Sequence, residues 1–330
     1  MKQVFRSICI AGFSVFLSMH LSAQDQTASV RGLLGSLVLG SPTRFENLTL
    51  IPLSLPKTGG SLPYVTLDEA LRQKLLEITE IDGGTVPHVA IGNKSDKIIF
   101  IMGGEIITGG KQDRVVGGDV LIGPKTRRIM VPVFCVEAGR WTYTTPAFTT
   151  RENLGTWTIR EKALKKEPAS QGGIWNEVGK LANATSTSSD TSALQDVYAD
   201  GDVNRRIEEV EKKLENVPQL APGTLGIACG VGGRIVSLDV FSDPALFAKL
   251  WPKILRSAAL SAVSDEAKGS VTRSQAADFL QKLSDARFVQ SGGAGIGADV
   301  KATAEGMTIG ALGYKGVAVH VVAFPRTSEE

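Results

Sequence analysis

The sequence predicts an α+β fold built mainly from antiparallel sheets. Short apolar runs separated by turn residues fill residues 86–136 and return after residue 224, whereas the middle of the chain carries apolar residues at helical spacing. Runs of strands followed by runs of helices are typical of this class. We therefore expect an N-terminal half rich in antiparallel sheet or sandwich, followed by helices packed on a second, mainly antiparallel sheet.

The first 23 residues have the order of a secretory signal peptide. Lys2 and Arg6 precede an apolar run from Ile8 to Leu21, and Ser22 and Ala23 follow it. The run is about 14 residues long, whereas a membrane-spanning helix needs about 20. We expect cleavage near Ala23 and export to the periplasm or medium, with an uncleaved anchor as the alternative. No later run is long and apolar enough to span a membrane.

Charge argues against a nucleic-acid partner. The formal net charge is +2, and removal of residues 1–23 takes away Lys2 and Arg6 but no acidic residue, which leaves the mature chain near zero. Such a chain has no global field that attracts nucleic acid or an anionic membrane. A phosphate-bearing ligand would have to be held by a local cluster of cations.

The remaining chain is long enough for one large core. We expect a flexible lead over residues 24–44, a single α+β domain over residues 45–324 and a tail over residues 325–330. Two lobes, about 45–160 and 161–324, are the alternative division of the domain.

The N-terminal part should begin with a strand and a helix. Phe45 to Leu53 is apolar and ends at prolines, which is typical of a strand. Thr66 and Glu69 have the spacing of a capping box. The helix that it starts would bury the residues that recur on one face, namely Leu67, Leu71, Leu75 and Ile78.

Four strands should follow between residues 86 and 136. They are Val86–Ile91, Ile98–Met102, Val120–Ile122 and Arg128–Val136. Gly123–Thr126 has the composition of a hairpin turn between the last two. Pro132 within the last run indicates an edge strand or a bulge, because proline cannot donate a ladder hydrogen bond.

The middle of the chain is predicted to be helical. One helix would bury a face made by Ile174, Trp175, Val178 and Leu181, and a Ser/Thr-rich loop follows it. A second would bury Val203, Ile207, Val210, Leu214 and Val217. Its two heptads are too few for a coiled coil, so we expect it to dock on the protein's own sheet, with a partner helix as the alternative.

The C-terminal third returns to strands. Leu225–Cys229 and Arg234–Val240 flank a glycine-rich hairpin turn, and two strands close the chain, Thr308–Leu312 and Val317–Phe324. Between them, Asp243 caps a helix that begins at Pro244 and that Trp251-Pro252 should bend or divide. Another helix should begin at the capping box of Thr272 and Gln275 and bury Ala276, Phe279, Leu280 and Leu283.

The cysteines and histidines suggest no metal centre. Cys135 and Cys229 both lie in apolar strand patterns, where a free thiol behaves as a small hydrophobe. We expect two buried thiols, and a disulfide in the exported protein is the alternative. His88 and His320 lack metal-ligand spacing to any cysteine, and we expect no metal and no cofactor.

The densest polar segment runs from Gly103 to Arg114. Its glycines would let the backbone approach a ligand closely, and it contains Glu105, Lys111, Gln112 and Arg114. Glu105 is the candidate general base, which would require partial burial to raise its pKa. Lys111 and Arg114 are the candidate clamp for a phosphate or carboxylate. The alternative is a set of salt bridges on a hairpin.

A second polar segment, Cys135 to Trp141, contributes Glu137, Arg140 and Trp141. If its strand pairs near the strand before Glu105, the two segments meet at one edge of the sheet. The alternative is a local pair between Glu137 and Arg140 beside a core tryptophan.

Known catalytic and nucleotide-binding motifs are absent. Gly110-Lys111 is followed by Gln112 rather than Ser or Thr, and Glu105 stands where a phosphate-binding loop requires glycine. Gly293–Gly297 has the wrong spacing for a dinucleotide fingerprint and is expected to be a turn. There is no Gly-x-Ser-x-Gly, and a dyad of Cys229 and His320 would need two distant strands to meet.

An ordered set of short motifs resembles the ARG and Rhodanese-Phosphatase-superfamily-associated protein domain. The resemblance covers about Phe45 to Phe324 and is specific in the middle of the chain. Its motifs are Leu67-Asp68-Glu69-Ala70, Gly104-Glu105, Lys111-Gln112-Asp113-Arg114, Val131-Pro132-Val133, Cys135-Val136-Glu137 and Gly139-Arg140-Trp141, followed by Trp175-Asn176-Glu177-Val178, Phe241 and Trp251.

The resemblance implies a fold and a set of residues, not a reaction. It points to Glu105, Lys111, Gln112, Arg114, Cys135, Glu137, Arg140 and Trp141. This chain departs from the family pattern at Asp113, where asparagine is expected, and at Ile106, where a second glutamate is expected. Loss of that carboxylate weakens any acid/base pair or metal site there.

Three functions fit the sequence. The first is an exported binding or accessory module whose polar surface around Glu105–Arg114 contacts a partner or an anionic small molecule. The second is a hydrolase of a phosphate- or sugar-bearing small molecule, of nucleotide or ADP-ribose type, with Glu105 as base. The third is a structural envelope component that uses the helix at residues 203–217.

Overall fold

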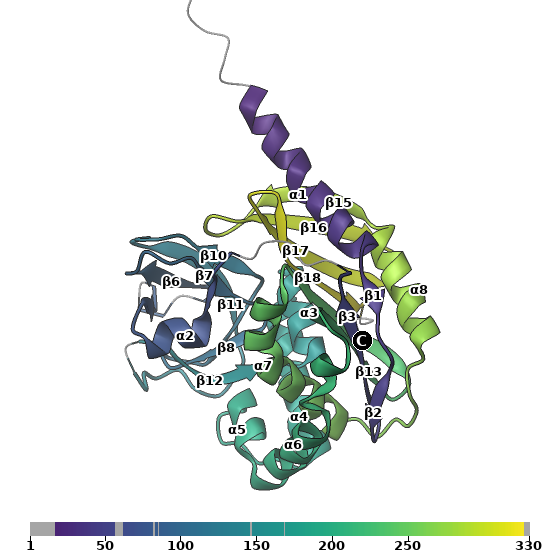
Figure 1. Cartoon of the computed structure of the whole chain (residues 1–330). Coiled ribbons are helices and arrows are strands. Elements are labelled where there is room, and N and C mark those ends of the chain that lie inside the picture. The colour runs from purple at the N-terminus through teal and green to yellow at the C-terminus, as the bar shows by residue number, and fades with distance from the viewer. Residues whose placement is uncertain are drawn as a thin grey trace, which may run out of the picture.

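The structure is a computed structural model that describes residues 17–56, 62–81, 83–84, 86–145, 147–167 and 169–326. It is a mixed α+β protein in which one large antiparallel sheet stands beside two smaller sheets, with helices between and around them (Figure 1). The expected fold class is therefore confirmed.

The large sheet is nine-stranded and joins the two ends of the chain. The early strand β3 pairs with the late strand β13, with Leu50 opposite Cys229. The division into lobes at about residue 160 therefore does not separate the sheets. In sheet order the strands are β1 (Val38–Leu39), β3 (Leu48–Ser54), β13 (Thr224–Val231), β14 (Arg234–Phe241), β18 (Val317–Pro325), β17 (Met307–Tyr314), β16 (Ala298–Ala304) and β15 (Arg287–Gly292), with β2 (Thr43–Phe45) paired to β3.

Residues 76–154 form the two smaller sheets, together with the short strand β4. The three-stranded sheet is β10 (Val120–Ile122), β7 (Ile99–Ile101) and β4 (Val65–Thr66), and β4 pairs with β7 in parallel. The six-stranded sheet is β12 (Thr149–Leu154), β8 (Glu105–Thr108), β9 (Arg114–Val116), β11 (Ile129–Cys135), β6 (His88–Asn93) and β5 (Leu76–Thr79). A separate apolar core that includes Ile99 and Val133 lies between them.

The helices cover both faces of the large sheet. On one face α1 (Leu17–Gly35) and α8 (Arg273–Ser284) bury Val30, Leu34 and Leu283 (Figure 1). On the other face α7 (Pro244–Val263) fills the space between the large sheet and the smaller sheets. The remaining helices are α2 (Leu67–Arg72), α3 (Trp157–Lys165), α4 (Ser170–Thr185), α5 (Leu194–Ala199), α6 (Gly201–Leu214) and the 3-10 helix η1 (Val217–Leu220).

Helix starts and the C-terminal strands agree with the expectations. Both capping boxes form, at Thr66 and at Thr272, and the Asp243 side chain accepts from the N–H groups of Ala245 and Leu246. β13 and β14 form the glycine-turn hairpin, and β17 and β18 pair. Trp251-Pro252 does not divide α7, which continues through Pro252.

The N-terminal half differs from the expectations in several places. Residues 86–136 contain six strands rather than four, because residues 105–116 contribute β8 and β9. Residues 24–44 are not an unstructured lead, because they carry the second half of α1 and the strands β1 and β2. The helix after Thr66 ends at Arg72, and Leu76–Thr79 is a strand because it pairs with β6. β10 and β11 are not a hairpin, since β10 pairs with β7 and β11 pairs with β6 and β9.

Pro132 lies where β11 changes partners, not on an edge. Residues 129–132 pair with β6 and residues 133–135 pair with β9. The missing N–H of proline falls at this switch, and its carbonyl accepts from Gly117 at 2.9 Å.

The helix expected at residues 203–217 is α6, and its apolar face docks mainly on α7 rather than on a sheet. Cys135 and Cys229 are both free and buried, as expected. Residues 1–16 of the expected signal peptide lie outside the described residues.

Candidate functional site

The two polar segments meet at one end of the strand pair β9 and β11. Arg114 is opposite Cys135 in this antiparallel pair, so the residues that precede Arg114 lie beside those that follow Cys135. The two segments meet because β11 pairs with β9. The strand before Glu105 is β7, and it pairs with β10 instead. We call the resulting group the Arg114 cluster; it consists of Glu80, Lys111, Gln112, Asp113, Arg114, Cys135, Glu137, Arg140, Trp141 and Tyr143.

Arg140 holds the cluster together. Its guanidinium binds both carboxylate oxygens of Glu137, with Nε–Oε1 at 2.7 Å and Nη2–Oε2 at 2.5 Å, and Nη2 lies 3.2 Å from Asp113 Oδ1. Nη1 donates to the carbonyls of Gly110 and Thr142, both at 2.9 Å. Burial opposes ionisation of Glu137, but the Arg140 bond outweighs it and lowers the Glu137 pKa. For Asp113 burial dominates and raises the pKa to about 6.

Arg114 lies beneath this network and is 1% exposed. Its Nη1 donates to Gln112 Oε1 at 3.0 Å and to the Cys135 sulfur at 2.7 Å, and Nη2 is 3.6 Å from Glu80 Oε1. Within the described residues, Arg114 Nε and Nη2 find no hydrogen-bond partner. Burial raises the pKa of the Cys135 thiol to about 11, so it stays protonated near neutral pH and is a poor nucleophile.

The exposed side of the cluster is aromatic and cationic. The Lys111 ammonium lies 5.1 Å from the Trp141 ring centroid and 5.3 Å from that of Tyr143, and each of these two residues is 51% exposed. A cavity of about 330 Å³ adjoins it, lined by Glu80, Tyr143 and neighbouring threonines. We call Lys111, Trp141 and Tyr143 the Lys111 surface.

Glu105 lies outside the Arg114 cluster. It begins β8, is 0% exposed and accepts from Met102 N–H at 2.8 Å. Its ion-pair partner is Lys253 on α7, at 2.5 Å, and Lys253 also pairs with Asp68 on α2. Burial raises the Glu105 pKa to about 7, although Lys253 opposes the shift. The structure therefore brings together all the site residues expected from the sequence except Glu105.

Comparison with known proteins identifies the family of the chain. The model of the ARG and Rhodanese-Phosphatase-superfamily-associated Protein domain matches residues 36–324. The chain belongs to this family. No curated protein and no solved structure matches it.

Two residues that bind the candidate site residues, Lys253 and Glu80, were not predicted from the sequence. Lys253 has a readable signal, because a lysine between Trp251-Pro252 and Ile254-Leu255 in an apolar helix implies a buried ion pair. Glu80 has no such signal. It accepts from the backbone of Lys111 at 2.8 Å, but only the tertiary fold brings it there.

Proposed function

We propose that the protein is an exported binding module whose ligand contacts the Lys111 surface. The observation that carries the proposal is a lysine ammonium flanked by two half-exposed aromatic rings. Exposed aromatics beside a cation are typical of binding surfaces, since rigid rings supply contact area at low entropic cost. The Arg140 network beneath supports such a surface because it fixes the segment that carries both rings.

The chemistry of the surface favours a small anion that also carries a ring with a face able to stack on an aromatic side chain. Lys111 would bind a phosphate or carboxylate, and Trp141 or Tyr143 would stack on a base or a sugar face. Nucleotides, ADP-ribose and sugar phosphates combine these two features.

Binding fits the geometry better than hydrolysis with Glu105 as base. Both Glu105 oxygens are engaged, the side chain is buried, and its cation is Lys253 rather than Lys111. Near Lys111, Glu137 is committed to Arg140 and the Cys135 thiol is protonated. A general base must reach its substrate's proton, and Glu105 has no exposed surface for this.

Export is supported by the basic, apolar and small-residue order of residues 1–23. Among the described residues no helix has the length and apolarity to cross a membrane. N-terminal sequencing of protein from the periplasm and medium tests the proposal. A chain that begins near Gln24 is expected, and a cytosolic pool that retains Met1 would contradict export.

Thermal shift tests the binding proposal. The full mature chain is heated with AMP, ADP-ribose and glucose 6-phosphate, and a ligand at 100 times its Kd should add about 2.7 kcal/mol of stability. Lys111→Ala should abolish the response. Lys315→Ala is the matched control, because Lys315 also packs against a tyrosine, 5.3 Å from the Tyr314 ring, away from the Arg114 cluster. No response of the wild type, or an equal response of Lys111→Ala, would overturn the proposal.

A further inference from the structure

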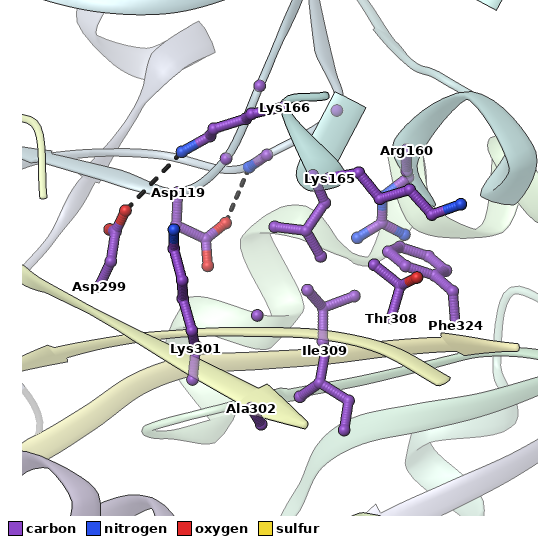
Figure 2. A pocket seen from close by; sticks show the side chains of 18 of the residues that line it. Asp119, Arg160, Lys165, Lys166, Asp299, Lys301, Ala302, Thr308, Ile309 and Phe324 are labelled. Atoms are coloured by element: carbon purple, nitrogen blue, oxygen red, sulfur yellow. Dashed lines mark hydrogen bonds and ion pairs between the residues drawn. The ribbon is translucent and has the colours of Figure 1, made fainter. Parts of the chain in front are cut away.

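A second pocket lies between the smaller sheets and the large sheet. Its volume is about 230 Å³ (Figure 2). The turns Gly103-Gly104 and Gly117-Gly118 form one wall, the end of α3 forms another, and β16–β18 form the floor. We call it the glycine-turn pocket; the Lys111 surface contributes no residue to it.

The pocket has polar ends and an apolar middle. Figure 2 shows Asp119, Lys166, Asp299 and Lys301 on one side and Arg160, Lys165 and Thr308 on the other. Ile309 lies on the floor between them, and the Phe324 ring lies under the Arg160 guanidinium on the second side. A ligand with a charged group and a short apolar body would match this arrangement.

Two of the three acidic side chains that line the pocket, Asp119 and Asp299, are already compensated by the protein, and the third, Glu167, is exposed to solvent. Asp119 accepts from Gly103 N–H at 2.8 Å and lies 2.7 Å from His320 Nδ1. His320 Nε2 is 3.3 Å from Asp239, which binds Arg160 at 2.5 Å. Burial opposes the charge on His320, but Asp119 and Asp239 raise its pKa to about 9, so His320 is cationic near neutral pH and neutralises Asp119. Asp299 pairs with Lys166.

The cationic groups are not fully used. Lys301 has no ion-pair partner within 4.0 Å among the described residues, and the Lys166 to Asp299 contact is long, at 3.7 Å. Arg160 is 4% exposed, and its Nε has no hydrogen-bond partner in the described part of the chain. Unused donors in a cavity are the expected counterpart of an anionic ligand.

Two glycines lie directly against these cations. A Cβ on Gly104, where φ is +96°, would lie 2.5 Å from the Arg160 side chain. A Cβ on Gly118 would lie 3.2 Å from the Lys166 ammonium. Gly104 is therefore required by its backbone conformation and by the packing of Arg160, whereas the flexible end of Lys166 could move away from a Cβ on Gly118.

We propose that the glycine-turn pocket binds a small organic anion, a carboxylate or phosphate monoester with a short apolar body, through Lys301, Lys166 and Arg160. A volume of about 230 Å³, below the roughly 300–1,000 Å³ of sites for drug-sized ligands, favours a small anion over ADP-ribose or a dinucleotide. The site is independent of the Lys111 surface, which has room for larger ligands because it is open.

Isothermal titration calorimetry of the full mature chain tests the proposal, with inorganic phosphate, glycerol 3-phosphate and succinate as probes. Lys301→Ala and Lys166→Ala should each weaken binding by about tenfold or more, the effect of losing one charge-assisted hydrogen bond. Lys301 is exposed, so its replacement should leave the fold intact.

Two controls distinguish binding in this pocket from binding to lysines elsewhere on the protein. Lys315→Ala should bind the probes as the wild type does. The loss of affinity in Lys301→Ala should also persist when Lys111→Ala is present in the same chain, because that background removes any binding at the Lys111 surface. The proposal is overturned if the wild type binds none of the three probes, or if Lys301→Ala and Lys166→Ala both retain wild-type affinity.

Discussion

At the scale of residues, the protein buries its charged side chains as connected networks. Lys253 joins Glu105 and Asp68, whereas His320 joins Asp119 and Asp239. An isolated buried charge costs several kcal/mol, so each member depends on its partners. Both networks cross between the smaller sheets and the C-terminal elements, and they therefore specify how these parts meet.

Lys253→Met should destabilise the protein by about 3–5 kcal/mol, because it leaves Glu105 and Asp68 as neighbouring buried carboxylates. Lys249→Ala is the matched control one turn earlier in α7, where the lysine is 38% exposed and pairs with Glu69. An exposed pair contributes about 0–1 kcal/mol. Urea unfolding measures both, and similar losses would show that the buried network has no special role.

His320 should make stability fall as pH rises from 7 to 9. Its pKa is raised to about 9 in the folded protein, above the ordinary value of 6.5. A raised pKa means that the folded state holds the proton more tightly, so the stabilisation is complete below pH 6.5 and is lost as pH rises through 9. Melting temperatures measured across this range should fall by an amount equivalent to a few kcal/mol.

His320→Gln should flatten that pH dependence, and His88→Gln, on β6, should leave it unchanged. A wild-type melting temperature that stays constant between pH 7 and 9 would contradict the protonated His320.

At the scale of elements, the starts of the helices could be predicted from local sequence signals. The extent of α2 and the partners of the strands depend on tertiary pairing. The Thr66 and Thr272 caps were predictable because a capping box involves only four successive residues. The extent of α2 was not. Leu75 and Ile78 fit a helical face, but Leu76 and Ile78 equally fit a strand face, and the pairing of β5 with β6 selects the strand. The partners of β10 and β11 are likewise set by distant strands.

The part of α1 that follows the expected cleavage point should be sufficient for the helix to stabilise the fold. Its C-terminal part buries Val30, at 0% exposure, and Leu34, at 2%, against the large sheet. A chain that begins at Gln24 keeps this contact, whereas one that begins at Ser36 loses both side chains, which is worth about 3–6 kcal/mol of burial. Urea unfolding should give a normal midpoint for the first chain and a clearly lower one for the second. Equal midpoints would show that α1 adds nothing to stability.

At the scale of the whole molecule, the sequence predicted which residues gather but not all of their partners. Lys111–Arg114 and Cys135–Trp141 lie at the same end of two adjacent strands, β9 and β11, so their convergence follows from the pairing of nearby chain segments. Glu105 could not be assigned in this way, because its partner Lys253 is 148 residues away on α7. Glu80 and the lining of the glycine-turn pocket depend in the same way on the final arrangement of the sheets.

The most direct test of the Lys111 surface is the fluorescence of Trp141 during titration with AMP, ADP-ribose and glucose 6-phosphate. The account predicts that a ligand changes the emission of the wild type and of Trp175→Phe, which lacks the 38% exposed tryptophan of α4. The change should vanish in Trp141→Phe. An undiminished change in Trp141→Phe, or no change in any of the three chains, would contradict a binding site at Lys111, Trp141 and Tyr143.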